Sequence, residues 1–227
     1  SPFIPTRRVC SFGTQDSTKA IGKITSSIFI TDEEIVEEHP MRFLSNSPFV
    51  STEPSPGILY IFNKPNHNEE IFNLLIAKMY AISITPTNKH VILQQTSKSC
   101  VPTCVAMLLL DHGKKPDYAS IKKTYLATDD KAITWIKKGG LIPKRSDLSN
   151  EYNRLELLVA CLNENGPGIL FIYHPEISCH AIILDEISKK TKTAMIRDPY
   201  HGRALTIKLD TFLSWVDEGS SFIQVSK

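Results

Sequence analysis

The chain has 227 residues, of which 41% are hydrophobic, and a formal net charge of +2. This length suits one large domain, or one domain with a sizeable extension, and the apolar fraction is sufficient for a packed core. A net charge so close to zero argues against the strongly basic surface of a nucleic-acid-binding protein. The longest apolar runs, such as VAMLLL, are far too short to span a bilayer, and the first residues contain no hydrophobic signal core.

In the first part of the chain, the pattern predicts few regular elements. Residues 1–30 are rich in Ser, Thr and Arg without a regular period, so a poorly ordered arm is expected. Capping residues and apolar periodicity predict a helix at 31–40, a strand at 57–63 and a helix at 67–83. The TPTN stretch at 85–88 then interrupts the pattern. We place a boundary at about residue 86, which separates an N-terminal extension or subdomain of unknown role (1–86) from a second domain (87–227).

The second domain is expected to begin with a short strand at 89–94 and to continue with helices, followed by an antiparallel sheet, which is an α+β layout. The spacing of apolar residues predicts helices at 102–111, 116–126, 128–140 and 151–166. Pro102 in the first turn of the first helix, and glycines at the ends of several of them, support this prediction. Runs of β-branched and aromatic residues separated by turn residues predict strands at 168–174, 179–187, 193–200, 204–209 and 221–226, with a closing helix at 210–219.

The five cysteines are an odd number and lie inside these expected elements, so we expect reduced thiols. No CxxC pair is present, and no zinc site is expected. Two of the cysteines, Cys100 and Cys104, stand at the front of the apolar helix. Cys100 directly precedes the helix, where free backbone N–H groups and the helix dipole stabilise a thiolate and few core contacts are expected. Cys104 lies one turn further in, where burial would raise its pKa. Cys100 is therefore the candidate nucleophile, and Cys10, Cys161 and Cys179 are expected to be structural.

A thiolate nucleophile needs a base and a group that orients the base. His180 lies in the strand expected at 179–187, and Asp198 lies at the end of the next strand, so antiparallel pairing can bring them together. Asp185, at the end of the His180 strand, is the alternative carboxylate. An amide N–H of Gln94 or Gln95 can stabilise an oxyanion beside the backbone N–H of Cys100.

Each of these residues also has an ordinary structural interpretation. A cysteine at this position can be a small buried hydrophobe, a histidine in an apolar strand is usually structural, and Asp before Pro is common in turns. Their order and their placement on these elements favour the catalytic interpretation. His201, in the PYHG turn, is expected to be a surface residue that borders the site.

Four segments, taken in this order, resemble papain-like cysteine peptidases: QTSKSCVPTCVAMLL, GPGILFIY, SCHAIIL and IRDPYHGRALTI. The similarity is closest to the bacteriocin-processing peptidases, which cut double-glycine leader peptides at the front of certain ABC exporters. That family has a Gln six residues before its Cys, as Gln94 is here, and a His and an Asp-Pro pair that match His180 and Asp198. Val101 replaces the Gly that usually follows the nucleophile. The resemblance covers 89–225.

The resemblance implies a papain-like α+β fold, with helices packed on a C-terminal antiparallel sheet, and a cysteine protease that hydrolyses a peptide bond. It implies Cys100, His180, Asp198 and Gln94 as catalytic residues, no metal or organic cofactor, and a protein or peptide substrate. Two alternatives remain open: a glutamine deamidase or acyl transferase with the same triad, and a catalytically inactive binding module. Standalone domains of this kind resemble secreted bacterial effectors, so we expect a cytoplasmic location or secretion into a reducing host cytosol. The sequence does not indicate an oligomeric state.

Overall fold

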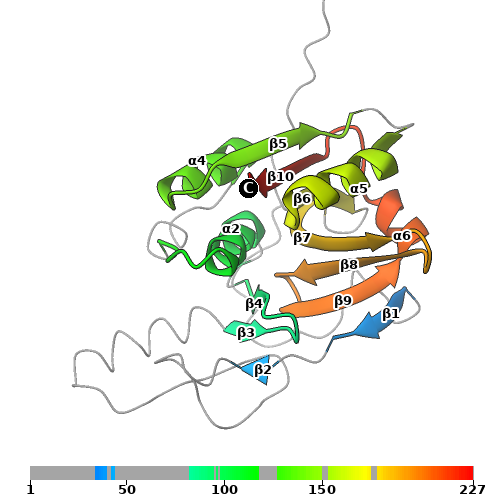
Figure 1. The fold of residues 1–227 in the computed structure, drawn as a ribbon, viewed down its shortest axis with the longest axis horizontal. Coiled ribbons are helices and arrows are strands. Elements are labelled where there is room, and N and C mark those ends of the chain that lie inside the picture. Colours follow the sequence, from blue (N-terminus) through cyan, green and yellow to red (C-terminus); the bar gives the residue numbers. More distant parts are fainter. Residues whose placement is uncertain are drawn as a thin grey trace, which may run out of the picture.

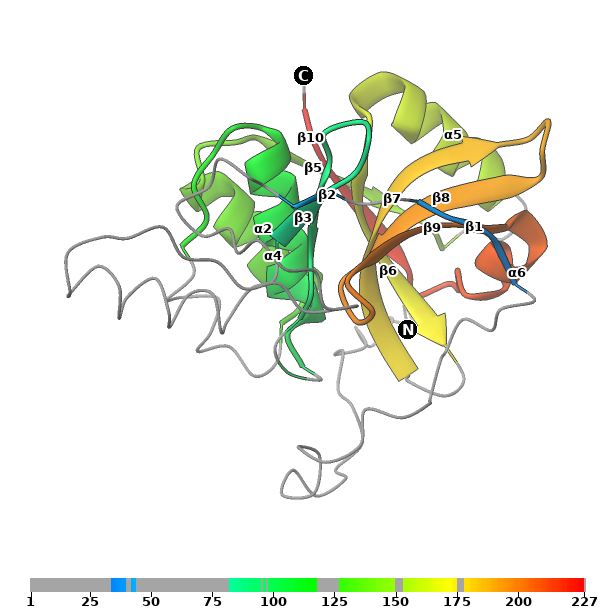
Figure 2. The ribbon, with the colours of Figure 1, turned by 90° about the horizontal axis from the view of Figure 1, so that it is seen from below.

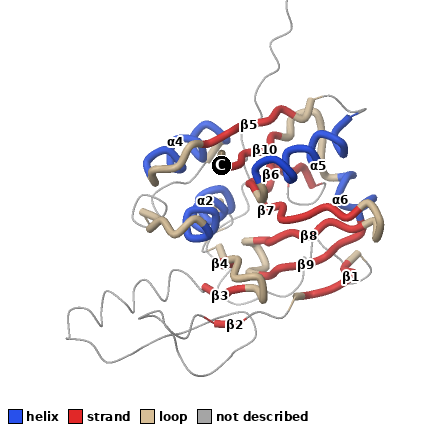
Figure 3. Tube along the Cα trace, in the orientation of Figure 1, coloured by secondary structure: helices blue, strands red, loops and turns tan. Residues whose placement is uncertain are grey.

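The structure is a computed structural model that describes residues 34–39, 42–43, 82–94, 96, 98–117, 127–149, 153–174 and 178–226. These residues form a mixed α+β fold dominated by strands (Figures 1 and 3). The expected α+β class and antiparallel sheet are thereby confirmed, whereas the papain-like identity of the fold stays a prediction. In the described part of the chain, no helix combines the length and apolar character needed to cross a bilayer.

The main sheet has seven strands in the order β1-β9-β8-β7-β6-β10-β5, and every neighbouring pair is antiparallel. Its strands are β1 (Ile35–Glu38), β5 (Pro143–Asp147), β6 (Gly168–His174), β7 (Ser178–Ser188), β8 (Thr193–Asp198), β9 (Arg203–Lys208) and β10 (Ser221–Val225). A second sheet has three strands in the order β2 (Arg42–Phe43), β3 (Ile82–Ile84) and β4 (His90–Ile92).

In the described part of the chain, four helices pack on the two faces of the main sheet. Helices α2 (Cys100–Asp111) and α4 (Asp129–Lys138) lie to one side of β6 and β10, and α5 (Arg154–Asn165) and α6 (Leu209–Ser214) lie to the other (Figure 2). Because both faces are covered, the central strand β7 is apolar on both sides. Ala181 and Ile183 join the core under α2, whereas Ile182 and Leu184 join the core under α5 and α6. This explains why β7 appears as a continuous apolar run instead of an alternating one.

Helix α2 is buried along almost its whole length, from Cys100 to Leu109. Apart from Thr103, whose hydroxyl donates to the carbonyl of Ser99, its residues from Cys100 to Leu110 are apolar, so it has no polar face to present to water and fits only inside a core. The helix begins two residues earlier than expected, at Cys100, and is followed by Gly113 in a left-handed conformation (φ 67°). Helix α4 carries Asp129 in its first turn and Lys138 in its last, both favourable to the helix dipole.

Three expectations about secondary structure need correction. The helix predicted at 31–40 is wrong, because Ile35–Glu38 is strand β1, which pairs with β9. Its β-branched start and the open edge of β9 override the local capping signal. The helix predicted at 67–83 is wrong at its end, where Ile82–Ile84 is strand β3. Strand β5 was not expected because PKRSD lacks apolar alternation, yet it pairs with β10 along its whole length.

Several other predictions fall outside the described residues. The arm at 1–30, the strand at 57–63, and the larger parts of the helices at 67–83 and 116–126 are among them. The boundary placed at about residue 86 coincides with the turn that joins β3 to β4. Strand β1, from before that boundary, pairs with β9, from after it. The division of the chain into two domains stays a prediction.

Candidate functional site

The start of α2, the start of β7 and the end of β8 meet at one end of the main sheet, next to the segment that follows β4. The backbone N–H of Gln94 donates a 2.7 Å hydrogen bond to the carbonyl of Pro199. Gly202, in the turn after β8, has a φ of 62°, and a Cβ atom built there would lie 3.1 Å from Cβ of Leu93. The close approach and the left-handed backbone both favour glycine at this position. This contact fixes the turn after Asp198 against the segment that leads to Cys100.

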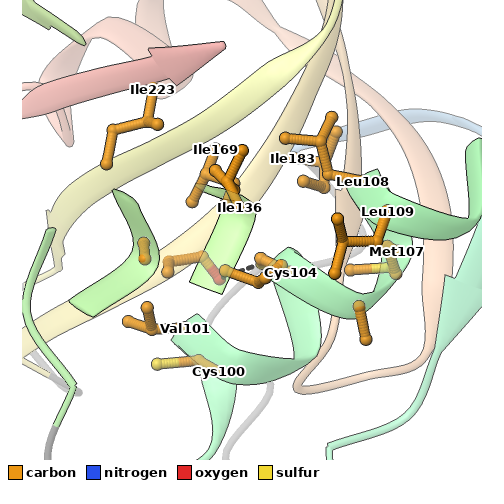
Figure 4. Packing of buried hydrophobic residues seen from close by; sticks show 14 of the residues in the cluster. Cys100, Val101, Cys104, Met107, Leu108, Leu109, Ile136, Ile169, Ile183 and Ile223 are labelled. Atoms are coloured by element: carbon orange, nitrogen blue, oxygen red, sulfur yellow. Dashed lines mark hydrogen bonds between the residues drawn. The ribbon is translucent and has the colours of Figure 1, made fainter. Parts of the chain in front are cut away.

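Cys100 is the first residue of α2, and Cys104 lies one turn further along it (Figure 4). In this first turn, the backbone N–H groups of Cys100 and Val101 have no acceptor within the helix, whereas Pro102 has no N–H and that of Thr103 donates to the carbonyl of Ser99. Cys100 is only 1% exposed and belongs to the core under α2, so the expectation of few core contacts is wrong. Because the helix starts at Cys100 instead of at Pro102, the thiol lies in its first turn and is covered by neighbouring side chains.

Cys104 is fully buried, and its thiol donates a 3.3 Å hydrogen bond to the carbonyl oxygen of Ala181 in β7. Burial, followed by the negative charge that Cys100 can carry, raises the pKa of the Cys104 thiol well above its usual value. The effect of burial on this thiol was expected from the sequence and is confirmed. Cys104 therefore remains a protonated, packed side chain at neutral pH.

His180 and Asp198 form a fully buried pair. His180 Nε2 lies 2.7 Å from Oδ1 of Asp198, and both side chains are 0% exposed. The side chain of Cys100 also lies close enough to act on the His180 ring. Because Asp198 engages Nε2, the ring nitrogen available for proton exchange with the thiol is Nδ1. Strands β7 and β8 and the start of α2 thus bring the predicted nucleophile, base and orienting carboxylate together.

The charges of this pair oppose the effect of its burial. Burial by itself lowers the pKa of His180, but the hydrogen bonds and charges of Asp198 and Cys100 outweigh it and raise that pKa to about 9. Burial likewise raises the pKa of Asp198, but hydrogen bonds from His180 and His201 outweigh it, so that the pKa falls below its usual value. At neutral pH, the imidazolium and the carboxylate are therefore the favoured forms.

His201 contacts Asp198 directly, and the sequence alone indicated no more than that it borders the site. Its ring Nδ1 and its backbone N–H both donate to Oδ2 of Asp198, the latter at 3.2 Å. The backbone N–H of Tyr200 donates to Oδ1 at 3.0 Å. An aspartate that accepts hydrogen bonds from the two residues that follow in a turn is a common turn motif. The spacing of Asp198 and His201 indicates the backbone turn, whereas the direction of the His201 ring depends on how that turn closes.

Gln94 is 9% exposed and lies between β4 and α2. Its side-chain amide donates a 2.9 Å hydrogen bond to the carbonyl of Thr96, and its Oε1 has no hydrogen-bond partner among the described residues. An amide NH₂ carries two donors, so this bond leaves one N–H for a further acceptor. Gln95 lies outside the described residues. The assignment of the oxyanion role to Gln94 stays a prediction.

The alternative carboxylate, Asp185, has a different partner. Arg197, which is completely buried, binds both of its oxygens, at 2.8 and 2.9 Å. The same guanidinium lies 2.8 Å from Oδ2 of Asp111, the last residue of α2, and donates to the carbonyl of His90 at 2.6 Å. This buried cluster ties the C-terminal end of α2 to β4, β7 and β8. It anchors the helix that carries Cys100 at the end opposite the thiol.

The remaining cysteines differ from one another. Cys161 is a free thiol near Oγ of Ser146, at 3.3 Å. Cys179 is disulfide-bonded, so the expectation that all thiols are reduced is wrong for this residue. Cys10 lies outside the described residues. In the part of the chain that the structure describes, no cluster of three His, Cys, Asp or Glu side chains is arranged to hold a metal ion.

Comparison with known proteins yielded no match to a protein-family model and no match to a curated protein. The functional interpretation of Cys100, His180 and Asp198 therefore depends on their own geometry and chemistry.

Proposed function

We propose that this protein is a papain-like cysteine peptidase that hydrolyses a peptide bond with a Cys100–His180–Asp198 triad. The observation that supports the proposal is the position of His180 between the other two members: Nε2 of its ring lies 2.7 Å from Asp198, and the side chain of Cys100 is close enough to raise its pKa. Nucleophile, base and orienting group within hydrogen-bond reach form the signature of an activated nucleophile. The second support is the position of Cys100 in the first turn of a 12-residue helix, where the helix dipole favours a thiolate.

In the proposed reaction, the Cys100 thiol has already given its proton to Nδ1 of His180, which is then in the imidazolium form favoured at neutral pH. The thiolate sulfur then attacks the carbonyl carbon of the scissile bond. The tetrahedral intermediate collapses to a thioester as the imidazolium returns its proton to the leaving amine. A water molecule then attacks the thioester and transfers a proton to His180. Release of the carboxylic acid restores the Cys100 thiol. Asp198 stays ionised and holds the ring of His180 in the required tautomer.

The negative charge on the intermediate's oxygen needs hydrogen-bond donors at fixed positions. The backbone N–H of Cys100 is one candidate, since it belongs to the first turn of α2 and has no acceptor within the helix. The remaining N–H of the Gln94 side chain is the other. The bond from Gln94 to Pro199 fixes the backbone of that residue relative to the turn after Asp198.

The proposal is tested by incubating the full chain with a protease-free cell lysate and with a mixed peptide library, followed by mass spectrometry of the products. Fragments that appear with the wild type and disappear with Cys100→Ala support peptidase activity. Cys161→Ala is the matched control, because Cys161 is also a buried free thiol but packs in the core under α5 and α6. Conversion of side-chain amides to acids or to acyl conjugates, without fragments, would replace the peptidase by a deamidase or transferase. No Cys100-dependent product in any assay would reject the enzyme proposal.

A further inference from the structure

The carboxylate of Asp198 binds two histidines, one on each oxygen. Oδ1 accepts from Nε2 of His180 at 2.7 Å and from the backbone N–H of Tyr200 at 3.0 Å. Oδ2 accepts from the backbone N–H of His201 at 3.2 Å and from its ring Nδ1. The side chain of His180 is completely buried, whereas that of His201 is 19% exposed. The proposed mechanism uses only the contact with His180 and leaves the second histidine unexplained.

The ring of His201 is not needed to close its own turn. The backbone N–H groups of Tyr200 and His201 already bring the turn back to Asp198, and Gly202 supplies the left-handed residue that follows. A small polar residue at position 201 would keep all of these backbone contacts. The imidazole adds one more donor to an oxygen that already accepts a hydrogen bond.

We propose that His201 is a positioning residue of the Cys100 site, which fixes the second oxygen of Asp198 and draws part of its negative charge away from His180. The contacts themselves do not depend on the proposed function, but their meaning for catalysis does. The ring of Tyr200 stands edge-on to both imidazoles, with its centroid 4.9 Å from that of His201 and 6.3 Å from that of His180. It thereby helps to hold both histidines around one carboxylate.

The physical effect of His201 follows from the sharing of one carboxylate by two donors. Each hydrogen bond that a carboxylate accepts stabilises its negative charge, so an additional donor makes it a weaker acceptor for the others. Without the ring of His201, more of the charge of Asp198 acts on His180 and stabilises its imidazolium form. The pKa of His180, which is about 9 in the wild type, should therefore rise further when the donor is removed. A base with a higher pKa returns its proton less readily to a leaving amine.

Other ionisable groups also surround the two histidines. They are Cys100 and Cys104 from α2, Arg197 and Asp198 from β8, Arg203 opposite Asp198 in β9, and Tyr200 in the turn. The side chain of Arg203 is paired with Glu38 of β1, and that of Arg197 with Asp185 and Asp111. All of these groups are the same in every variant at position 201. A change in the titration of His180 between variants therefore reports on the His201 ring.

The inference is tested by NMR titration of the histidine rings in the full chain, labelled with ¹⁵N-histidine. His201→Phe keeps a ring of similar shape without a donor, His201→Asn keeps a side-chain donor without a ring, and His201→Ala removes both. His112→Ala is the matched control, because His112 is exposed at the other end of α2. Comparison of His201→Phe with His201→Asn tests whether the side-chain donor at position 201 matters, even if His201→Ala does not fold.

With His201→Phe, the midpoint of the His180 titration is expected to rise by about one pH unit. His201→Asn should bring it back toward the wild-type value, and His112→Ala should leave it unchanged. Equal midpoints in the wild type and the Phe variant would overturn the inference and leave His201 as part of the turn. The same samples are alkylated at Cys100 at neutral pH. If Cys100 of the wild type does not react with the alkylating reagent, the proposed enzyme is rejected, whatever the NMR titration of His180 shows.

Discussion

The backbone N–H of Gln94 donates a hydrogen bond of 2.7 Å to the carbonyl of Pro199, which joins the segment before α2 to the turn after Asp198. The bond links two regions that are far apart in sequence. Because Cys100 follows Gln94 in the chain and Asp198 precedes Pro199, any shift of one segment relative to the other is limited close to the site. The positions of Cys100 and Asp198 are thus constrained by main-chain contacts as well as by His180.

Alkylation is expected to distinguish the two thiols of α2. Cys100 can pass its proton to His180, whereas burial raises the pKa of Cys104 and its thiol is bound to the carbonyl of Ala181. A brief treatment of the folded protein with iodoacetamide, followed by peptide mapping, should therefore label Cys100 first. His180→Ala should slow that labelling. Faster modification of Cys104 than of Cys100 would contradict the assignment of the nucleophile.

Removal of Asp198 should be less harmful to catalysis than removal of His180. An Asn at position 198 can still accept a hydrogen bond from the ring, and thiol enzymes with a Cys-His-Asn arrangement are known. Its NH₂ group cannot accept the two donors of His201, so Asp198→Asn should also lose about 1–3 kcal/mol of stability. The value of kcat/KM should fall in the order wild type, Asp198→Asn, His180→Ala, once a substrate is identified.

The double variant tests whether the two residues act as a unit. If the carboxylate works through the imidazole, as proposed, Asp198→Asn combined with His180→Ala should be hardly worse than His180→Ala alone. Losses that multiply would mean that Asp198 acts independently of His180.

The stability of the protein should fall as the pH rises from neutral toward 10. The pKa of His180 is raised from 6.5 to about 9 in the folded state. A raised pKa contributes stability that is fully present below the unfolded value, near 6.5, and is lost as the pH passes the folded value near 9, by about 3 kcal/mol in total. Denaturant unfolding between pH 6 and 10 measures this loss.

Two comparisons isolate the contribution of His180 to that loss. His180→Ala should show a smaller decrease over the same range, while His112→Ala should follow the wild type. Cys104 adds a separate alkaline loss, because its pKa is raised above 9.0 and its thiol stays protonated in the folded state when the unfolded chain ionises. That contribution is present in all three proteins. Parallel curves for the wild type and His180→Ala would contradict the raised pKa.

Arg197 should matter far more to stability than a neighbouring arginine on the surface. Arg197→Met leaves the buried Asp185 without its counter-charge and leaves Asp111 with His90 as its partner, which should cost about 3–5 kcal/mol. Arg203→Met breaks the half-exposed pair with Glu38 and should cost at most about 1 kcal/mol. Thermal or denaturant unfolding compares the two variants. Similar losses would show that the buried cluster does not anchor α2.

The elements predicted well are those whose signals are local. Strands β6 to β9 are apolar runs bounded by turn residues, and α4 and α5 are followed by glycines. The order of Cys100, His180 and Asp198 on a helix start and two neighbouring strands was likewise enough to expect them close together. Their catalytic roles remain predictions.

The elements missed depend on partners far away in the chain. Strand β5 has a polar sequence and is a strand because β10 lies beside it, and β1 is a strand because of β9. The buried pairing of Arg197 with Asp185 also required the fold, since charged residues of this kind are usually exposed. The second donor on Asp198 was missed because the direction of the His201 ring depends on how the turn after β8 closes, which the residue types alone leave open.

The pairing of β1 with β9 has a consequence for how the chain is made. Strand β1 occupies Ile35–Glu38 and its partner occupies Arg203–Lys208, so the ribosome releases the first long before the second. Strands β6, β7, β8 and β9 follow one another and can assemble through short connections, which favours rapid folding. The β1 edge of the sheet can therefore form only after β9 has been synthesised, and the opposite edge forms later still, because β5 pairs with β10. A nascent chain that stalls before residue 203 would leave β1 without its partner strand.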